Sequence, residues 1–230
     1  MSLDIDCGAL EQSLDESGWA LLPRLLDAEQ CAALVALYAQ PERFRSTVIM
    51  ARHGYGRGEY RYFDYPLPPP VAALRTALYR PLARIANEWC RRLALEVRYP
   101  AAHTRFLERC HAAGQRRPTP LLLRYQRGDF NCLHQDLYGE HVFPLQLTAL
   151  LSRPGTDFSG GEFVLTEQRP RRQSRAEVVP LGAGDAVVFA GQHRPFAATR
   201  GYSRATLRHG VSRVHRGERY TLGIIFHDAR

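Results

Sequence analysis

The 230-residue sequence contains no lysine, so arginine supplies all 31 cationic side chains other than histidine. The formal net charge of +8 favours electrostatic attraction to nucleic acid or to another acidic partner. A genomic bias toward arginine and alanine codons gives the same composition without any function. The charge alone therefore assigns no partner.

The sequence also lacks any recognisable cysteine pattern. The five cysteines are Cys7, Cys31, Cys90, Cys110 and Cys132. Their odd number, wide spacing and lack of a CxxC motif argue against a disulfide framework and against a cysteine zinc site. Such thiols are typical of a reducing compartment.

Long hydrophobic runs are absent, and none approaches the roughly 20 residues that a membrane-spanning helix needs. The first ten residues carry Asp4 and Asp6 and lack the basic and then apolar order of a signal peptide. We therefore expect a cytoplasmic protein with no membrane partner. A content of 45% hydrophobic and 23% charged residues suits one soluble globular domain with a substantial core.

The composition changes at Pro120. Three helices are predicted before this residue, at 27–40, 71–95 and 104–113. Asp27 and Gln30 form a capping box at the start of the first helix, and Pro81 is expected to kink or break the second. The segment from Arg52 to Tyr65, rich in Gly, Arg and Tyr, is predicted to be a loop.

After Pro120 the sequence consists of short apolar runs separated by Gly, Pro and polar turns, which is typical of a β-sandwich or barrel. Seven strands are predicted, at 121–125, 142–151, 162–166, 176–180, 186–190, 204–209 and 220–227. Without an internal repeat or long linker, residues 1–230 are expected to form a single domain. Residues 1–120 would be a helix-rich N-terminal layer, and residues 121–230 the core that holds the functional site.

The tripeptide from His134 to Asp136 is a candidate metal site. Side chains at positions i and i+2 of a β-strand point to the same face, so His134 and Asp136 can bind one metal ion. A further histidine would complete a set of two histidines and one carboxylate, which leaves coordination positions open on non-haem Fe(II). Taken alone, the motif can also be a polar pair at the end of a strand.

His209 is the preferred third ligand. The other later histidines are His193, predicted to lie in a loop, His215, in a turn, and His227, near the C-terminus. His209 alone is followed by the pattern V-x-x-V-x-x-G-x-R, which ends at Arg219. Arg219 adjoins an apolar strand, where its planar fork of donors suits a carboxylate ligand.

The order of these motifs resembles that of the Fe(II)- and 2-oxoglutarate-dependent dioxygenases, especially the prolyl-hydroxylase-like branch. The motifs are Y-x-x-G-(x)5-H-x-D at 125–136, Gly160-Gly161, G-D-A-V-V-F at 184–189 and H-x-V-x-x-V-x-x-G-x-R at 209–219. The resemblance covers about Leu121 to Asp228. The whole chain also resembles a bacterial group of such oxygenases that is linked with oxidation of damaged nucleic acid.

This resemblance implies an α+β fold whose core is a double-stranded β-helix, or jelly roll, beside the N-terminal helical layer. It implies three Fe(II) ligands, His134, Asp136 and His209. It implies three residues that bind 2-oxoglutarate, Arg219, Thr221 and Tyr125. Dioxygen is the second cosubstrate, and ascorbate is a further cofactor that the resemblance allows. The expected products are succinate, carbon dioxide and a hydroxylated or oxidatively demethylated substrate.

The substrate stays open among a protein side chain such as proline, a small molecule and a methylated nucleic acid. Arg52, Tyr55 and Arg57 are candidate substrate contacts, because a cationic and aromatic loop can stack bases, contact phosphates or close as a lid. A solvated loop is the plain alternative. Against nucleic acid, Ile225 stands where known base demethylases have a second Arg, six residues after the cosubstrate Arg.

A second class of function also stays open. A jelly-roll metalloprotein can bind a small ligand without any oxygen chemistry, because one fold hosts many functions. Arg219 and Thr221 discriminate against this class, since a simple metal-binding barrel does not need them. Nothing in the sequence assigns an oligomeric state.

Overall fold

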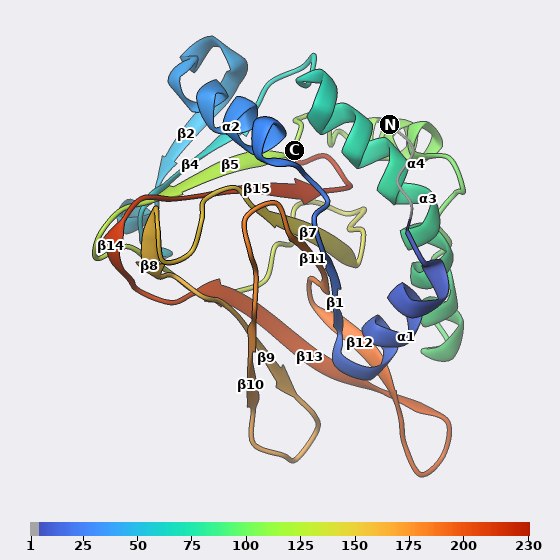
Figure 1. Ribbon diagram of the computed structural model, residues 1–230. Helices are drawn as coiled ribbons and strands as arrows, with labels where there is room; N and C mark the ends of the chain where they lie inside the picture. Colours follow the sequence, from blue (N-terminus) through green and yellow to red (C-terminus); the bar gives the residue numbers. More distant parts are fainter. Residues whose placement is uncertain (1–4) are drawn as a thin grey trace.

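The computed structural model describes residues 5–230, and its fold is built on two antiparallel β-sheets that lie face to face (Figure 1). The seven-stranded sheet has the order β1 (Trp19–Leu22), β11 (Ala186–Ala190), β7 (Leu145–Leu150), β15 (Arg219–Ile225), β5 (Leu121–Tyr125), β4 (Glu59–Phe63) and β2 (Phe44–Ile49). The six-stranded sheet contains β10 (Arg175–Val179), β9 (Phe163–Gln168), β13 (Tyr202–Val211), β6 (Phe130–His134) and β3 (Gly56–Arg57), with β12 (His193–Ala197) paired to β13. A two-stranded sheet joins β8 (Phe158–Gly160) to β14 (Val214–Gly217).

Within residues 5–230, four α-helices accompany the sheets: α1 (Cys7–Ser17), α2 (Ala28–Ala36), α3 (Pro69–Arg92) and α4 (His103–Ala112). Short 3-10 helices span Leu37–Ala39, Pro41–Arg43 and Met50–His53. The predicted capping box at the start of α2 is confirmed. The Asp27 carboxylate accepts the Gln30 N–H at 2.8 Å, and the Gln30 side chain accepts the Asp27 N–H at 3.0 Å.

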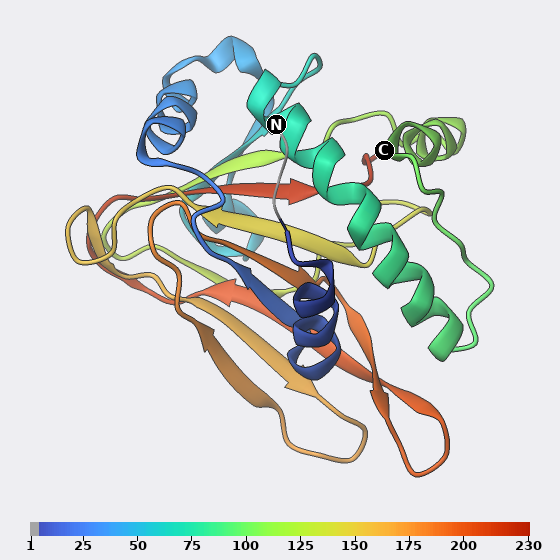
Figure 2. The same ribbon diagram turned by 45° about the vertical axis from the view of Figure 1, so that its right-hand side comes forward.

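Helix α3 covers the outer face of the seven-stranded sheet (Figure 2). Its apolar residues recur at intervals of three and four and are buried, as in Leu74, Leu78, Leu82 and Ile85. Each buried leucine contributes about 2 kcal/mol through removal of its apolar surface from water. Of the predicted kink or break at Pro81, the break was wrong, because the helix runs unbroken from Pro69 to Arg92, and the kink stays a prediction. The packing of this apolar stripe stabilises the helix, although Pro81 has no backbone N–H to donate.

The region before Pro120 is less purely helical than predicted. Its strands β1, β2 and β4 extend the seven-stranded sheet, and β3 joins the six-stranded sheet. The first 120 residues therefore help to build both sheets, and their helices form only a minor layer. Strand pairing is non-local, as in the pairing of Trp19 with Phe189, so the local composition of this region did not reveal it.

The prediction of a loop from Arg52 to Tyr65 was wrong for its second half. β3 pairs with β6, and β4 lies between β2 and β5, with Tyr60 opposite Leu123. Gly56 is required at this position, since its φ is +126° and a Cβ would lie 2.4 Å from the Phe130 carbonyl oxygen. The glycines that suggested a loop thus allow a close approach between two strands.

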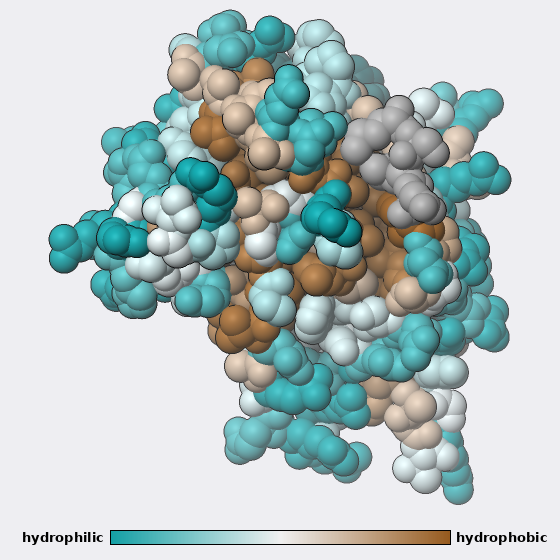
Figure 3. Space-filling view, in the orientation of Figure 1, coloured by the Kyte–Doolittle hydropathy of each residue, from teal (hydrophilic) through white to brown (hydrophobic). Residues whose placement is uncertain are grey.

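The surface of one face is shown in Figure 3, where apolar side chains gather toward the centre and hydrophilic side chains cover much of the periphery. The loop between β9 and β10, which contains Arg169, Arg171 and Arg172, projects from the sheet at the lower edge of this view. Within residues 5–230, no helix combines the length and the apolar character needed to cross a membrane.

Candidate metal centre and adjoining cavity

The six-stranded sheet brings His134, Asp136 and His209 together. His134 ends β6 and lies directly opposite His209 in the register of β6 and β13, with their ring centroids 4.2 Å apart. Asp136 follows two residues after His134, and the possible ligand atoms of all three side chains lie within 4.8 Å of one another. These three residues therefore form a cluster of metal-binding size.

A hydrogen bond to the backbone orients the His134 imidazole, and the imidazoles of His134 and His209 both face the carboxylate. Nδ1 of His134 lies 2.8 Å from the Cys132 carbonyl oxygen, which can only accept, so Nδ1 carries the proton and Nε2 is free to ligate. Nε2 of His134 lies 3.5 Å from Asp136 Oδ1, and Nε2 of His209 lies 3.3 Å from Oδ2. Both Nε2 atoms thus face the same carboxylate.

The electrostatics of the cluster favour an ionised carboxylate. Burial opposes the charge of Asp136, but hydrogen bonds and positive charge from His134 and His209 outweigh it and hold its pKa well below the ordinary value. Burial, together with the charge of His134, lowers the pKa of His209 although Asp136 opposes this shift. Two nitrogen donors and one carboxylate form a donor set that suits a divalent transition metal.

A cavity of about 220 Å³ adjoins this cluster between the two sheets. Its walls are mainly apolar and aromatic. The six-stranded sheet and its following loop contribute His134, Gln135, Asp136, Tyr138, Phe163 and His209, and the seven-stranded sheet contributes Tyr60, Tyr62, Leu123, Tyr125, Gln146, Thr148 and Thr221. The metal cluster therefore opens onto a space large enough for a small organic acid.

Arg219 does not line this cavity itself but is paired with Tyr125, which does, and it is almost fully buried, with 1% exposure. Its guanidinium lies over the rings of Tyr125 and Phe158, at 5.4 Å and 5.8 Å from their centroids. Burial lowers its pKa to about 10, although Tyr125 and Glu162 favour the charged form. Among residues 5–230, nothing accepts a hydrogen bond from its Nε or Nη1. A buried guanidinium in this condition is costly, and an anionic ligand would satisfy it.

The other two residues predicted for the cosubstrate lie beside Arg219. Tyr125 is opposite Arg219 in the register of β5 and β15, and Thr221 is two residues further along β15 on the same face. Both line the cavity, and the buried Tyr125 hydroxyl has no hydrogen-bond partner within the described part of the chain. These hydroxyls and the guanidinium form a group of donors at one side of the cavity.

The predicted substrate contacts are only partly gathered at the site. Tyr55 lines the cavity and is 49% exposed, with its ring stacked on His53. Arg57 is an exposed residue of β3 whose Nε lies 3.9 Å from Asp129 Oδ1. Arg52 lies on the short 3-10 helix before them and is exposed. Tyr55 alone of the three predicted residues lines the cavity.

The rival histidines lie outside the cluster. The prediction of a loop at His193 was wrong, because this residue begins β12 and pairs with Thr206 of β13. His215 is an exposed residue of β14, and His227 is buried with Nδ1 accepting the Phe143 N–H at 3.1 Å. The fold therefore brings His209, and none of these three, to His134 and Asp136.

Several residues that shape the site were not predicted from the sequence. Tyr60 and Tyr62 project into the cavity from β4, and their alternate spacing was a strand signal that the surrounding glycines obscured. Gln135, between the two predicted ligands, donates from Nε2 to the Leu207 carbonyl at 2.8 Å. This hydrogen bond links the segment that contains Asp136 to β13, the strand that contains His209.

Comparison with known proteins relates most of the chain to one oxygenase family. Residues 58–229 match the model of a family described as an oxygenase catalysing oxidative methylation of damaged DNA. An uncharacterised protein of Mycobacterium tuberculosis is 49% identical over 167 residues, which are 73% of this chain and 72% of that protein.

Two solved structures have a similar fold. A prolyl-4-hydroxylase of Pseudomonas putida has a TM-score of 0.55 at 17% identity, with 97% of this chain and 99% of that chain covered. An oxidoreductase of the 2OG-Fe(II) oxygenase family from Burkholderia pseudomallei has a TM-score of 0.57 at 18% identity, with 100% and 95% covered. At these identities the likeness concerns the fold.

Proposed function

The chain belongs to the oxygenase family whose model covers residues 58–229, and from this membership we propose that it is an Fe(II)- and 2-oxoglutarate-dependent dioxygenase. Its two antiparallel sheets then form the double-stranded β-helix of these enzymes, with the metal between them. Membership in an oxygenase family counts against the alternative of a jelly-roll metalloprotein that only binds a small ligand.

In this proposal His134, Asp136 and His209 hold Fe(II). The donor set fits the ion, since two neutral imidazoles and one carboxylate leave positions open for further ligands. When bound, Fe(II) supplies the site at which 2-oxoglutarate and dioxygen react. The Cys132 carbonyl keeps the His134 proton on Nδ1, so that Nε2 presents its lone pair to the metal.

The observation that carries the proposal is the buried and incompletely paired guanidinium of Arg219 next to the cavity. A planar cation with free N–H groups suits the distal carboxylate of 2-oxoglutarate, which can accept two hydrogen bonds side by side. The hydroxyls of Tyr125 and Thr221 lie on the same side and can add further hydrogen bonds. The apolar remainder of the cavity would exclude water from the reacting end of the ligand.

Anaerobic absorption spectroscopy tests this assignment. Adding Fe(II) and 2-oxoglutarate to the metal-free protein should produce a visible charge-transfer band, because the bound oxo-acid chelates the metal. Arg219→Ala should weaken 2-oxoglutarate binding while leaving Fe(II) binding intact, and His209→Ala should remove the band. A folded protein that binds Fe(II) and shows no band would contradict the proposal.

For the substrate, we propose a methylated base in DNA, in line with the description of the family. The surface around β3 and β6 supports this choice, since it alternates cations with aromatic rings. The exposed Tyr55 stacks with His53. The guanidinium of the exposed Arg213 lies 5.4 Å from the ring centroid of Phe130, which is paired with Arg57 across β6 and β3. Such a surface can stack bases and contact phosphates.

The cavity composition bears on how a base would be recognised. Tyr60, Tyr62 and Tyr138 offer aromatic faces for a planar ring, which suits a base that has been turned out of the stack. Ile225 also lines the cavity, so this wall has no second arginine six residues after Arg219. Recognition would therefore depend on stacking and on amides such as Gln146, whose buried Nε2 has no partner among the described residues.

The cosubstrates account for every atom gained or lost in the overall reaction. One oxygen atom of O2 enters the methyl C–H bond to give a hydroxymethyl group, and the other enters succinate as 2-oxoglutarate loses carbon dioxide. A hydroxymethyl group on a base nitrogen then leaves as formaldehyde. We expect methylated single-stranded DNA to stimulate succinate formation above the level seen with unmethylated DNA. Equal rates with both, or stimulation only by a proline-containing peptide, would contradict this substrate.

A further inference from the structure

The loop that follows Asp136 returns a tyrosine hydroxyl to the carboxylate. Tyr138 donates a hydrogen bond from its hydroxyl to Asp136 Oδ1 at 2.7 Å, and this hydroxyl accepts one from Tyr62 at 3.2 Å. Tyr62 comes from β4 of the opposite sheet, and the guanidinium of Arg45 lies 4.4 Å from its ring centre. The candidate metal ligand is therefore linked to the facing sheet through two hydroxyl groups.

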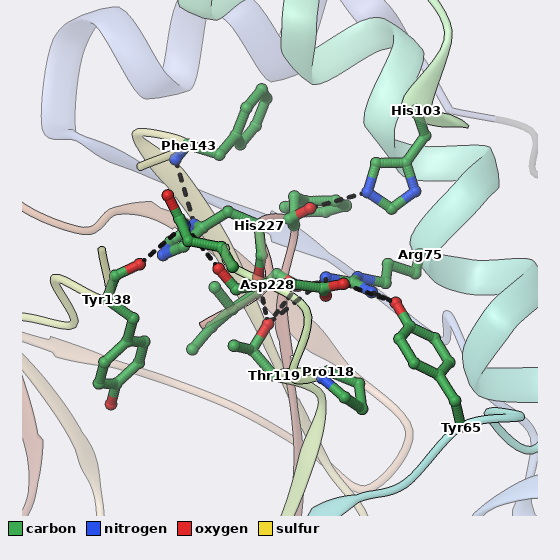
Figure 4. Close-up of polar contacts among 12 residues, drawn as sticks. Tyr65, Arg75, His103, Pro118, Thr119, Tyr138, Phe143, His227 and Asp228 are labelled. Atoms are coloured by element: carbon green, nitrogen blue, oxygen red, sulfur yellow. Dashed lines mark hydrogen bonds and ion pairs between the residues drawn. The ribbon is translucent and has the colours of Figure 1, made fainter. Parts of the chain in front are cut away.

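The backbone of Tyr138 is fixed as firmly as its side chain. The fully buried Gln115 donates from Nε2 to the carbonyls of Tyr138, at 3.0 Å, and Asp228, at 2.6 Å. Its Oε1 accepts the His141 N–H at 2.7 Å. Figure 4 shows the Tyr138 carbonyl bonded into this polar cluster while the ring points away from it. Gly139 completes the turn with φ +95°, where a Cβ would lie 2.5 Å from the Gln115 side chain.

The two oxygens of Asp136 consequently have different neighbours. Oδ1 accepts the Tyr138 hydroxyl at 2.7 Å and lies 3.5 Å from Nε2 of His134, whereas Oδ2 lies 3.3 Å from Nε2 of His209 and receives no hydroxyl from the described residues. A lone pair used by a strong hydrogen bond is less available to a metal, and the bond also limits rotation of the carboxylate. An unrestrained carboxylate can instead chelate a metal through both oxygens and occupy an additional coordination position.

We propose that Tyr138 is a positioning residue that makes Asp136 a one-oxygen metal ligand through Oδ2 and so keeps a coordination position open for the cosubstrates. Tyr62 supports the Tyr138 hydroxyl from the facing sheet through its hydrogen bond of 3.2 Å. The inference rests on the proposed function, because it assumes that His134, Asp136 and His209 bind a metal.

Water-proton relaxation with Mn(II) measures the property that Tyr138 is proposed to control. Metal-free wild type, Tyr138→Phe, Tyr62→Phe and Tyr99→Phe would each be saturated with Mn(II), and the relaxation enhancement would be compared per bound ion. Tyr99→Phe is the matched control, since the Tyr99 hydroxyl donates to the Val142 carbonyl at 2.8 Å, near the same loop but away from the carboxylate.

Tyr138→Phe should lower the enhancement by about a third, because a two-oxygen carboxylate would displace one of roughly three waters on the open positions. After addition of 2-oxoglutarate, wild type should retain an exchangeable water and Tyr138→Phe should retain none. Tyr62→Phe and Tyr99→Phe should match wild type. Equal enhancement in wild type and Tyr138→Phe would overturn the inference, as would an equal fall in Tyr99→Phe.

A measurement on wild type alone covers the case in which Tyr138→Phe does not fold. The infrared carboxylate stretches of aspartate labelled with carbon-13 should shift, on Mn(II) binding, in the pattern of a ligand bound through one oxygen. The pattern of a chelating carboxylate would refute the role of Tyr138 with the metal site intact. Failure of wild type to bind Mn(II), or equal binding by His209→Ala, would instead refute the metal site itself and this inference with it.

Discussion

Arg219 and Tyr125 are paired across β15 and β5, and the buried guanidinium lies over the Tyr125 ring with two of its nitrogens lacking acceptors among the described residues. The same strand pair therefore places a cation and a hydroxyl beside the cavity that the metal cluster adjoins. Burying this charge without a full set of acceptors destabilises the folded protein, and the carboxylate of a bound dicarboxylic acid would offset that free energy.

Replacing Arg219 by Met should separate stability from binding. The variant should be as thermally stable as wild type without ligand, or more stable, because an incompletely paired buried charge is exchanged for an apolar chain. Its affinity for 2-oxoglutarate should fall by roughly 10- to 100-fold, the equivalent of one charged hydrogen-bonded contact. Thermal unfolding with and without 2-oxoglutarate, in the presence of Mn(II), measures both effects. Ligand-induced stabilisation equal to that of wild type would contradict the role of Arg219.

Replacing Gln135 by Ala should weaken metal binding through an indirect contact. The amide Nε2 of Gln135, the residue before Asp136, donates a hydrogen bond to the carbonyl of Leu207, which lies two residues before His209. Loss of this hydrogen bond should allow Asp136 and His209 to move apart. We expect a loss of about 10-fold in Mn(II) affinity, as is typical when a residue that orients metal ligands is removed. Gln126→Ala is the control, because the exposed Gln126 amide bonds to Glu218 away from the cluster. Equal affinities in the two variants would argue against this tie.

Mild acid should destabilise the protein through His103. Burial, together with the charge of Arg75, lowers the pKa of His103 to about 4, although its bond to the Phe226 carbonyl opposes this shift. The unfolded chain, with a histidine pKa near 6.5, binds more protons between pH 6.5 and 4, so stability falls as pH falls through this window. His103→Gln should show a smaller loss of unfolding free energy from pH 7 to pH 4.5 in urea titrations. An identical pH dependence in both proteins would contradict the assignment.

The buried ion pair between Arg75 and Asp228 should matter far more than exposed pairs. Arg75 Nη2 lies 2.8 Å from Asp228 Oδ1, and Tyr65 also bonds to both side chains (Figure 4). Asp228→Ala should cost about 3–5 kcal/mol, because it leaves the Arg75 charge buried without its partner. Glu108→Ala, which breaks the exposed pair with Arg105, should cost at most about 1 kcal/mol. Urea denaturation of the two variants compares them, and similar losses would refute this account of the pair.

The residues of the metal cluster were predictable from the sequence because each is marked by a short pattern of neighbouring residues. The i and i+2 spacing of His134 and Asp136 places both on one side of an extended segment, and the pattern after His209 distinguishes that histidine from its rivals. The pairing of His134 with His209 across β6 and β13 supplied what the spacing could not, the approach of two distant segments.

The surroundings of the site were harder to predict because they depend on contacts between distant segments. Tyr60 and Tyr62 were hidden in a stretch whose glycines indicated a loop, although those glycines allow β3 and β6 to approach closely. Pro81 lacks an N–H, but packing of one face of α3 against the sheet outweighs that loss. The role of Gln115 depends on three carbonyls from two other segments, which no local pattern encodes.

The most direct test of the central claim is the conversion of 2-oxoglutarate to succinate by the Fe(II)-loaded protein. Wild type should form succinate only when Fe(II) and dioxygen are both present. His209→Ala should abolish this conversion, and His193→Ala, which changes a histidine of β12 outside the cluster, should retain it. Absence of succinate from folded, Fe(II)-loaded wild type, or equal conversion by His209→Ala, would contradict the assignment of His134, Asp136 and His209 as the oxygenase metal centre.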